Sequence, residues 1–100
     1  MKIESKIETL TVTGISELAA NNAAQVRDDV RQALTDEHTT IEVDLSLTSF
    51  LDSSGLGALI ALHKTMVSKG GVVRLVNPSQ VTEQVLELTR MHRIFEIVRN

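Results

Sequence analysis

The stretch from Ile41 to Leu62 narrows the choice of folds more than any other part of the chain. It opens with apolar residues that alternate with acidic ones, the pattern of a strand with one buried face. From Leu56 onward apolar residues recur at helical spacing, and Gly70-Gly71 is typical of a helix end. The sequence therefore predicts a strand, a polar loop over Ser46 to Asp52 and a helix in immediate succession.

The rest of the chain continues to alternate strands with helices. Such alternation requires crossover connections, so we expect one α/β domain over residues 1–100 with a single mixed sheet of about five strands and about three packed helices. The predicted element order is ββαβαβαβ, with an antiparallel hairpin at the amino end. The predicted strands are two short ones across Lys2 to Thr13, one after Thr40, one from Val72 to Val76 and one from Ile94 to Val98. The predicted helices begin at Asn22, after Asp52 and at Asn77-Pro78. Gln25 and Gln80 complete capping boxes in the first and the third of these helices.

Composition excludes several classes of protein. A chain of 100 residues that is 42% hydrophobic and 23% charged has room for one core. Without cysteine it has no disulfide, thiolate catalyst or cysteine-based zinc site. A net charge of -3 and only two aromatic residues, Phe50 and Phe95, argue against nucleic-acid binding. No apolar run approaches the ~20 residues of a membrane span and no signal peptide is evident, so we expect a cytoplasmic protein without a membrane partner.

The hexapeptide Asp52-Ser53-Ser54-Gly55-Leu56-Gly57 is the strongest candidate site. Asp52 is predicted to be the N-cap, with its carboxylate accepting from the amide of Ser54 or Gly55. The two serine hydroxyls then lie in the first helical turn, where free amides and the helix dipole favour an anion. A phosphate there would lie beside the Asp52 carboxylate and change what can dock. Because the loop follows the carboxyl end of a strand, we expect the binding surface at this place.

One face of the predicted helix has unusually small side chains. On a helical wheel the exposed face carries Ser54, Gly57, Ala58, Ala61 and Thr65. Gly55 and Gly57 should each cost roughly 1 kcal/mol relative to alanine, which suggests that they allow close approach of another backbone. That face is either a docking surface or a second packing layer within the domain.

Catalysis and metal binding are not expected. The three histidines are scattered, no Gly-x-Ser-x-Gly elbow surrounds the serines, and no phosphate-binding loop is present, so we expect no enzyme activity and no cofactor. His63 should be a largely buried neutral side chain bonded to backbone, while His38 and His92 should be solvated. The acidic pairs Asp28-Asp29 and Asp36-Glu37 should face solvent without holding a metal.

At Asp52 to Gly57 the sequence resembles the STAS-domain family, specifically the bacterial anti-anti-sigma factors, whose signature around the phosphorylated serine reads Asp-Ser-Ser-Gly-Leu-Gly. The resemblance implies the STAS fold and phosphorylation at Ser53, with Ser54 as the alternative. Together with the small-residue face, it places partner binding at Asp52, Ser53, Ser54, Gly55, Gly57, Ala58 and Ala61. Further matches are Asp44-Leu45-Ser46, Phe50-Leu51, Gly70-Gly71, Asn77-Pro78, Val85-Leu86 and Ile94-Phe95.

The resemblance also implies a regulatory function. The unmodified protein would bind an anti-sigma factor that is also a serine kinase and so release the sigma factor. The kinase would phosphorylate Ser53 from ATP and end the complex, and a phosphoserine phosphatase would reset it. Alternatives are a STAS partner switch with a secretion or signalling target, and a STAS subunit of a transport assembly that is never phosphorylated.

Two departures from the family pattern bear on partners. Sporulation-type relatives end their second strand in Gly-Glu-Leu-Asp, whereas here Gly14 is followed by Ile15 to Ala19 without an aspartate. The last predicted strand runs almost to Asn100, where relatives often continue into another helix. We therefore expect a less covered sheet edge and a monomer or weak homodimer.

Overall fold

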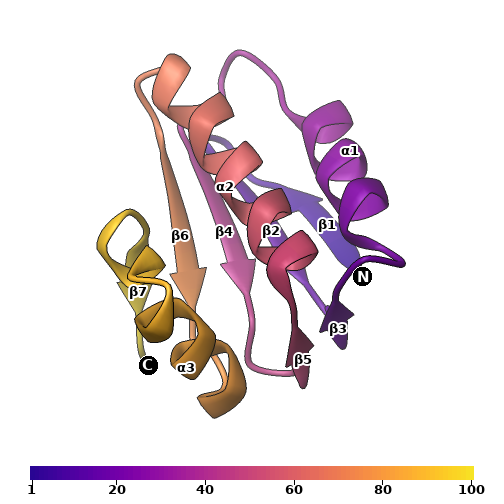
Figure 1. Ribbon diagram of the computed structural model, residues 1–100. Coiled ribbons are helices and arrows are strands. Elements are labelled where there is room, and N and C mark those ends of the chain that lie inside the picture. Colours follow the sequence, from indigo (N-terminus) through magenta and orange to yellow (C-terminus); the bar gives the residue numbers. More distant parts are fainter.

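A mixed five-stranded sheet forms the centre of the computed structural model, which describes residues 1–100 (Figure 1). The strands lie in the order β1-β2-β4-β6-β7. β1 and β2 pair antiparallel and all other neighbours in this sheet pair parallel, which confirms the predicted mixed α/β fold. The bounds are β1 Lys2–Ser5, β2 Thr9–Thr13, β4 Thr40–Asp44, β6 Val72–Val76 and β7 Glu96–Val98.

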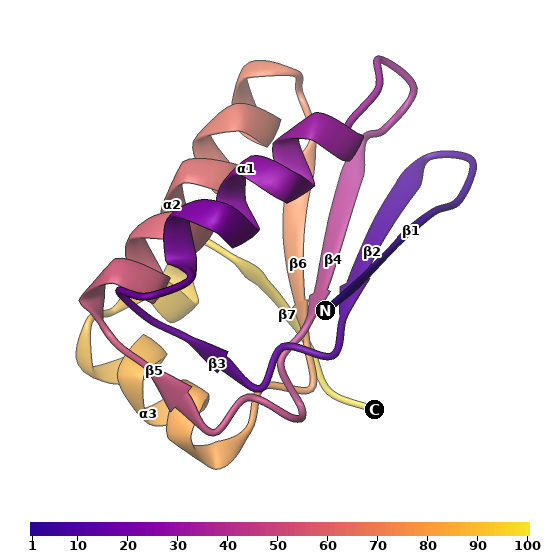
Figure 2. The same cartoon turned by 90° about the vertical axis from the view of Figure 1, so that its right-hand side faces the viewer.

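The helices α1 Ala23–Ala33 and α2 Ser53–Ser68 lie side by side on one face of this sheet (Figures 1 and 2). The third helix, α3 Gln80–Leu88, follows β6 and leads into a short 3-10 helix, η1 Met91–Arg93. No helix combines the length and the apolar character that crossing a membrane requires.

The core lies between the sheet and the helices. In β2, β4 and β6 every second residue is buried and its neighbours are half-buried, as the period-two pattern predicts. The buried strand residues join α2 side chains such as Leu59, Leu62 and Met66 in one apolar cluster of 18 residues. The cluster fixes α2 along the sheet and thereby the position of its first turn.

A second, very small sheet was not predicted. β3 Glu17–Leu18 and β5 Phe50–Leu51 pair parallel, with Leu18 beside Leu51. Each has only two residues, too few to show any periodicity in the sequence. β5 carries the chain from the end of β4 to the start of α2, and its pairing with β3 buries Leu18 and Leu51 in the core.

Two predicted capping boxes are wrong. Asn22 is the N-cap of α1, but its Oδ1 accepts from the Ala19 amide at 2.8 Å instead of capping the helix. α3 begins after Ser79, not at Pro78, and the Ser79 hydroxyl accepts from the Thr82 amide at 3.3 Å. The Asn22 side chain bonds a backbone amide before α1, and the Ser79 hydroxyl caps α3, so neither helix has the bonds that the capping-box spacing predicts.

The histidines also differ from their predictions, except for His92, which is exposed. His38 is only 2% exposed, and both nitrogens of its buried ring have partners. Thr35 donates its amide to Nδ1 at 3.0 Å, and Nε2 lies 2.9 Å from the Ser5 hydroxyl. His63 is half-buried, and its buried Nδ1 has no hydrogen-bond partner where a backbone partner was expected. Its ring instead meets the edge of Phe95 at a centroid distance of 5.6 Å.

Candidate functional site

Asp52 organises the start of α2. As predicted, it is the N-cap, and its Oδ1 accepts from the Gly55 amide at 2.9 Å. Its Oδ2 accepts from the Ala20 amide at 3.1 Å, which the sequence did not indicate. These backbone donors, Gly55 above all, lower the pKa of the Asp52 carboxyl below its ordinary value. The carboxylate is therefore ionised at neutral pH and joins α2 to the segment between β3 and α1.

Ser53 and Ser54 are the first two residues of α2, and both are exposed. Neither hydroxyl takes part in a hydrogen bond within the chain, since the cap is supplied by Asp52 alone. Other serines are engaged: Ser49 donates to the Ser16 carbonyl and Ser79 to the Thr48 carbonyl. Both predicted phosphorylation candidates thus present a free hydroxyl to solvent beside an ionised carboxylate.

Gly55 allows close approach of another backbone, as predicted, and that backbone belongs to the chain itself. A Cβ on Gly55 would lie 2.0 Å from the Leu18 carbonyl oxygen of β3 and 2.8 Å from Leu51 Cδ1. Gly55 is accordingly buried. That side of α2 therefore packs against β3 and β5 within the chain.

The small-residue face of α2 is exposed only in part. Ala58 is 5% exposed and Ala61 half-buried, so the expectation of an exposed face is wrong at Ala58. The reason is α1, whose Arg31 lies against α2 and donates to the Ala61 carbonyl at 3.4 Å and to Thr65 Oγ1 at 3.3 Å. Gly57 differs, because it is exposed and a Cβ there would meet no atom within 4 Å. Ala58 and Ala61 therefore serve packing inside the domain, whereas Ser54 and Gly57 remain exposed.

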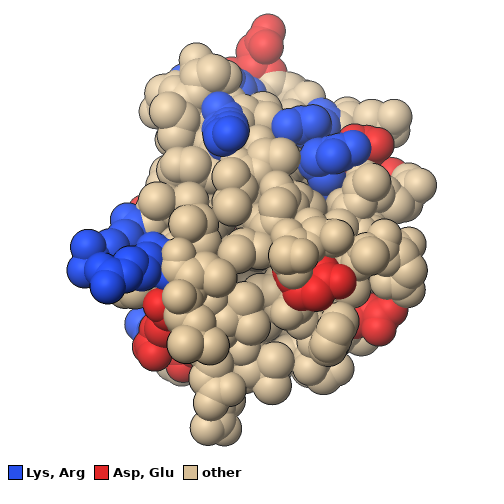
Figure 3. Space-filling model, viewed as in Figure 1, with Lys and Arg blue, Asp and Glu red and all other residues tan.

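Two exposed apolar side chains near the serines were not among the predicted site residues. Phe50, three residues before Ser53, is 53% exposed, and Leu47 is 70% exposed. Their only sequence signal is that they interrupt an otherwise polar loop. They give the carboxyl end of β4 an apolar surface next to the start of α2. In Figure 3 the basic side chains lie apart from this end, over the upper half of the view and near η1.

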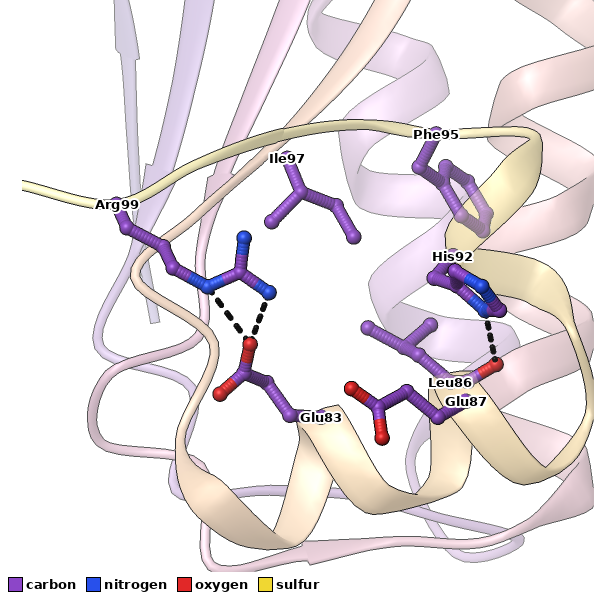
Figure 4. Close-up of a pocket in the computed structure, with 7 residues that line it drawn as sticks. All are labelled: Glu83, Leu86, Glu87, His92, Phe95, Ile97 and Arg99. Carbon is purple, nitrogen blue, oxygen red and sulfur yellow. Dashed lines mark hydrogen bonds and ion pairs between the residues drawn. The ribbon is translucent and has the colours of Figure 1, made fainter.

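The most enclosed hollow of the molecule lies elsewhere, between α3, η1 and β7 (Figure 4). It measures about 220 Å³ and contains no predicted site residue. At one edge Arg99 pairs with Glu83, while His92 Nδ1 faces the Leu86 carbonyl. No group of three or more His, Asp or Glu side chains is arranged to hold a metal ion.

Comparison with known proteins identifies the family. The sequence matches the STAS domain over residues 1–100. The chain belongs to the STAS-domain family. The family assigned from the Asp52 to Gly57 hexapeptide is thereby confirmed, and the relatives and solved structures described below carry the name anti-sigma factor antagonist.

Two curated relatives come from Thermotoga. A candidate anti-sigma factor antagonist of Thermotoga maritima is 40% identical to this STAS domain over 53 residues, which are 53% of this chain and 47% of the relative. Its homologue in Thermotoga neapolitana is 38% identical over 53 residues, with the same coverage of 53% and 47%. The match thus spans about half the length of these relatives.

Solved structures agree in fold over nearly the whole chain. The crystal structure of a candidate anti-sigma factor antagonist from Thermotoga maritima has a TM-score of 0.89 at 27% identity, covering 99% of this chain and 85% of that one. The anti-sigma factor antagonist SpoIIAA in its unphosphorylated form has a TM-score of 0.85 at 24% identity, covering 99% and 86%. Bacillus SpoIIAA in its phosphorylated form has a TM-score of 0.78 at 24% identity, covering 99% and 89%. The two SpoIIAA likenesses show the fold.

Proposed function

We propose that this STAS domain is an anti-sigma factor antagonist that acts as a partner switch controlled by phosphorylation of Ser53. The unphosphorylated form binds an anti-sigma factor with serine-kinase activity, which releases the sigma factor. Phosphorylation of Ser53 ends that complex, and a phosphoserine phosphatase restores it. The observation that carries this proposal is the exposed, unbonded Ser53 hydroxyl at the start of α2, next to the ionised carboxylate of Asp52.

Electrostatics make this serine an effective place for a switch. A phosphate adds about -1.5 to -2 charges at neutral pH, directly beside the single charge of Asp52. The two groups then present about three negative charges where one existed, on a surface that also carries the exposed apolar Phe50. A partner that packs against Phe50 would have to desolvate those charges, so docking is weakened by repulsion and by desolvation.

The same phosphate should leave the fold intact. It would lie at the amino end of α2, where the helix dipole and unpaired amides stabilise an anion. The Gly55 and Ala20 amides remain engaged with Asp52, so the phosphate need not displace the cap. The likeness of this chain to SpoIIAA structures of both the unphosphorylated and the phosphorylated form supports a switch that changes the surface and not the architecture.

The test is a pull-down from lysate of the source organism with wild-type, Ser53→Ala and Ser53→Asp baits. The partner should be retained by the first two and lost from the third. Ser68→Asp adds the same charge at the other end of α2, about 22 Å away along the helix, and should retain the partner. Ser54→Asp decides between the two hydroxyls, because loss of the partner from this bait alone would move the switch to Ser54.

Mass spectrometry of the retained proteins identifies the partner and so distinguishes control of a sigma factor from control of another target. An anti-sigma kinase that phosphorylates the wild-type bait with ATP, but not Ser53→Ala, supports the full proposal. A secretion or signalling protein with the same dependence on Ser53 would give a partner switch with another target. Equal retention by Ser53→Ala and Ser53→Asp would remove Ser53 from the mechanism and favour a constitutive subunit of a larger assembly.

A further inference from the structure

A groove on the outer side of α2 has an apolar floor and no acidic side chain. It measures about 420 Å³ and runs between α2 and Ile94, the residue that follows η1. Two of its apolar side chains remain in solvent, Val67 at 56% and Ile94 at 37% exposed. The lining residues are Ile60, His63, Lys64, Val67, Ser68 and Ile94.

The charge around this groove is positive. Lys64 lines it and is exposed, and Arg90 and Arg93 of the adjoining segment are also exposed. None of the three takes part in an ion pair within the chain, whose five ion pairs involve other cations. Figure 3 shows basic atoms on both sides of an uncharged stretch between α2 and η1. A local positive rim in a chain of net charge -3 favours an acidic occupant.

The exposed side of α3 has the opposite character. Leu88 is 85% exposed and Val81 42% exposed, and they lie on one helical stripe with Gln84. Glu87 is exposed beside them and forms no ion pair within the chain. A shallow hollow of about 380 Å³ lies between Gln84, Glu87 and Leu88. α3 therefore presents an apolar face with one unpaired acidic side chain, Glu87, and the basic Arg90 follows two residues after Leu88.

We propose that two copies of the chain associate by placing α3 of one copy in the α2–η1 groove of the other. The lengths agree, since Ile60 to Val67 and Val81 to Leu88 each cover eight residues, a rise of about 10 Å or two helical turns. Leu88 enters the groove, Val67 enters the hollow beside Leu88, and Glu87 meets Lys64. Because α3 and Ile94 are neighbours in the chain, a two-fold axis between the copies makes the contact twice.

The association is weak and independent of the proposed phosphorylation. The contact involves few side chains and falls below the standard interface of about 1,600 Å², so we expect a micromolar or weaker dissociation constant. Ser53 lies fourteen residues from Val67, about 21 Å along α2. That separation exceeds the Debye length of about 8 Å at physiological salt. An experiment can therefore refute the proposed self-association without refuting the proposed Ser53 switch, and the reverse.

Sedimentation velocity on the full chain at loadings from about 10 μM to about 1 mM tests the proposal. The mass of the wild-type protein should rise with concentration from 11.0 kDa towards twice that value. Leu88→Glu should stay monomeric at every loading. Ile7→Glu is the matched control, because Ile7 in the β1–β2 turn is also 85% exposed and lies outside the contact. Thermal unfolding of both variants establishes that each is folded.

A charge exchange tests the orientation of the contact. Lys64→Glu and Glu87→Lys should each weaken dimerisation about twofold to thirtyfold, because each substitution removes both copies of an exposed ion pair. The double variant should recover much of that loss, since the pair re-forms between copies with its charges exchanged. A wild-type protein that remains monomeric at about 1 mM overturns the proposal. Dimerisation that Leu88→Glu and Ile7→Glu change equally also overturns it.

Discussion

Replacing Gly55 with alanine should destabilise the protein, whereas the same change at Gly57 should stabilise it. The two glycines stand two residues apart in α2, and alanine is favoured over glycine in a helix by roughly 1 kcal/mol at either position. Their surroundings differ. A Cβ on Gly55 would lie 2.0 Å from the Leu18 carbonyl oxygen, while a Cβ on Gly57 would meet nothing within 4 Å.

The size of the effect at Gly55 follows from that contact. Cβ atoms essentially never come closer than 3.0 Å to a heavy atom, so β3 and α2 must separate by about 1 Å or more. Overpacking of this kind costs about 1–3 kcal/mol, and the neighbour here is backbone that cannot rotate away. Movement of β3 also strains the bond from the Ala20 amide to Asp52. We therefore place the gross cost at the upper end, about 3 kcal/mol, which leaves a net loss of about 2 kcal/mol after the gain of about 1 kcal/mol in helix propensity.

Thermal and urea unfolding of the two single variants would measure both values. For a domain of this size about 1 kcal/mol corresponds to a change in Tm of roughly 4–8 °C. Gly57→Ala should raise Tm by that amount, and Gly55→Ala should lower it by about 10 °C. A Tm for Gly55→Ala at or above that of the wild type would show that β3 yields without cost. In that case Gly55 would not be required for the packing of α2 on β3.

Three further substitutions probe polar contacts, a helix cap at Asp52 and two buried side chains, His38 and Thr48. The fold stabilises ionised Asp52 and lowers its pKa, so this carboxylate contributes stability at neutral pH and loses that contribution as the pH falls below about 4. In Asp52→Asn the Tm should therefore decrease less steeply below about pH 4 than in the wild type. His38→Leu should cost about 1–3 kcal/mol in urea unfolding, because it leaves the Thr35 amide without its acceptor. Thr48→Val removes the donor that bonds the Ile15 carbonyl at 2.7 Å and should cost a similar 1–3 kcal/mol, or about 4–8 °C in Tm per kcal/mol.

Elements with a long periodic pattern could be predicted from the sequence. The strand Val72–Val76 has the predicted bounds, and α2 begins directly after its predicted N-cap, Asp52. The mixed five-stranded sheet follows from the alternation of such elements. Local patterns were sufficient here, because the period of buried residues and the N-cap can be read within each element, although the strand pairs with β4 and β7, which are distant in the sequence.

Features that depend on contacts between distant segments could not be predicted. β3 and β5 exist only because they pair with each other across more than thirty positions of sequence, from Leu18 to Leu51. His38 is buried by the amino-terminal hairpin through Ser5. Ala58 is buried on a helix that packs against α1, and such burial depends on how two helices pack and not on a residue's place on a helical wheel.

The fold requires a glycine at position 55 of the hexapeptide but not at position 57. Both glycines look alike in the sequence, yet Gly55 is required by the contact with Leu18 inside the chain. Gly57 has a helical neighbourhood, open space around it and no contact that a methyl group would disturb, so the fold alone favours alanine there by roughly 1 kcal/mol. A glycine that lowers the stability of the fold, and that no contact within the chain requires, is consistent with a contact made with another molecule. Gly57 stands one turn after Ser53, on the exposed surface where the proposed partner would bind.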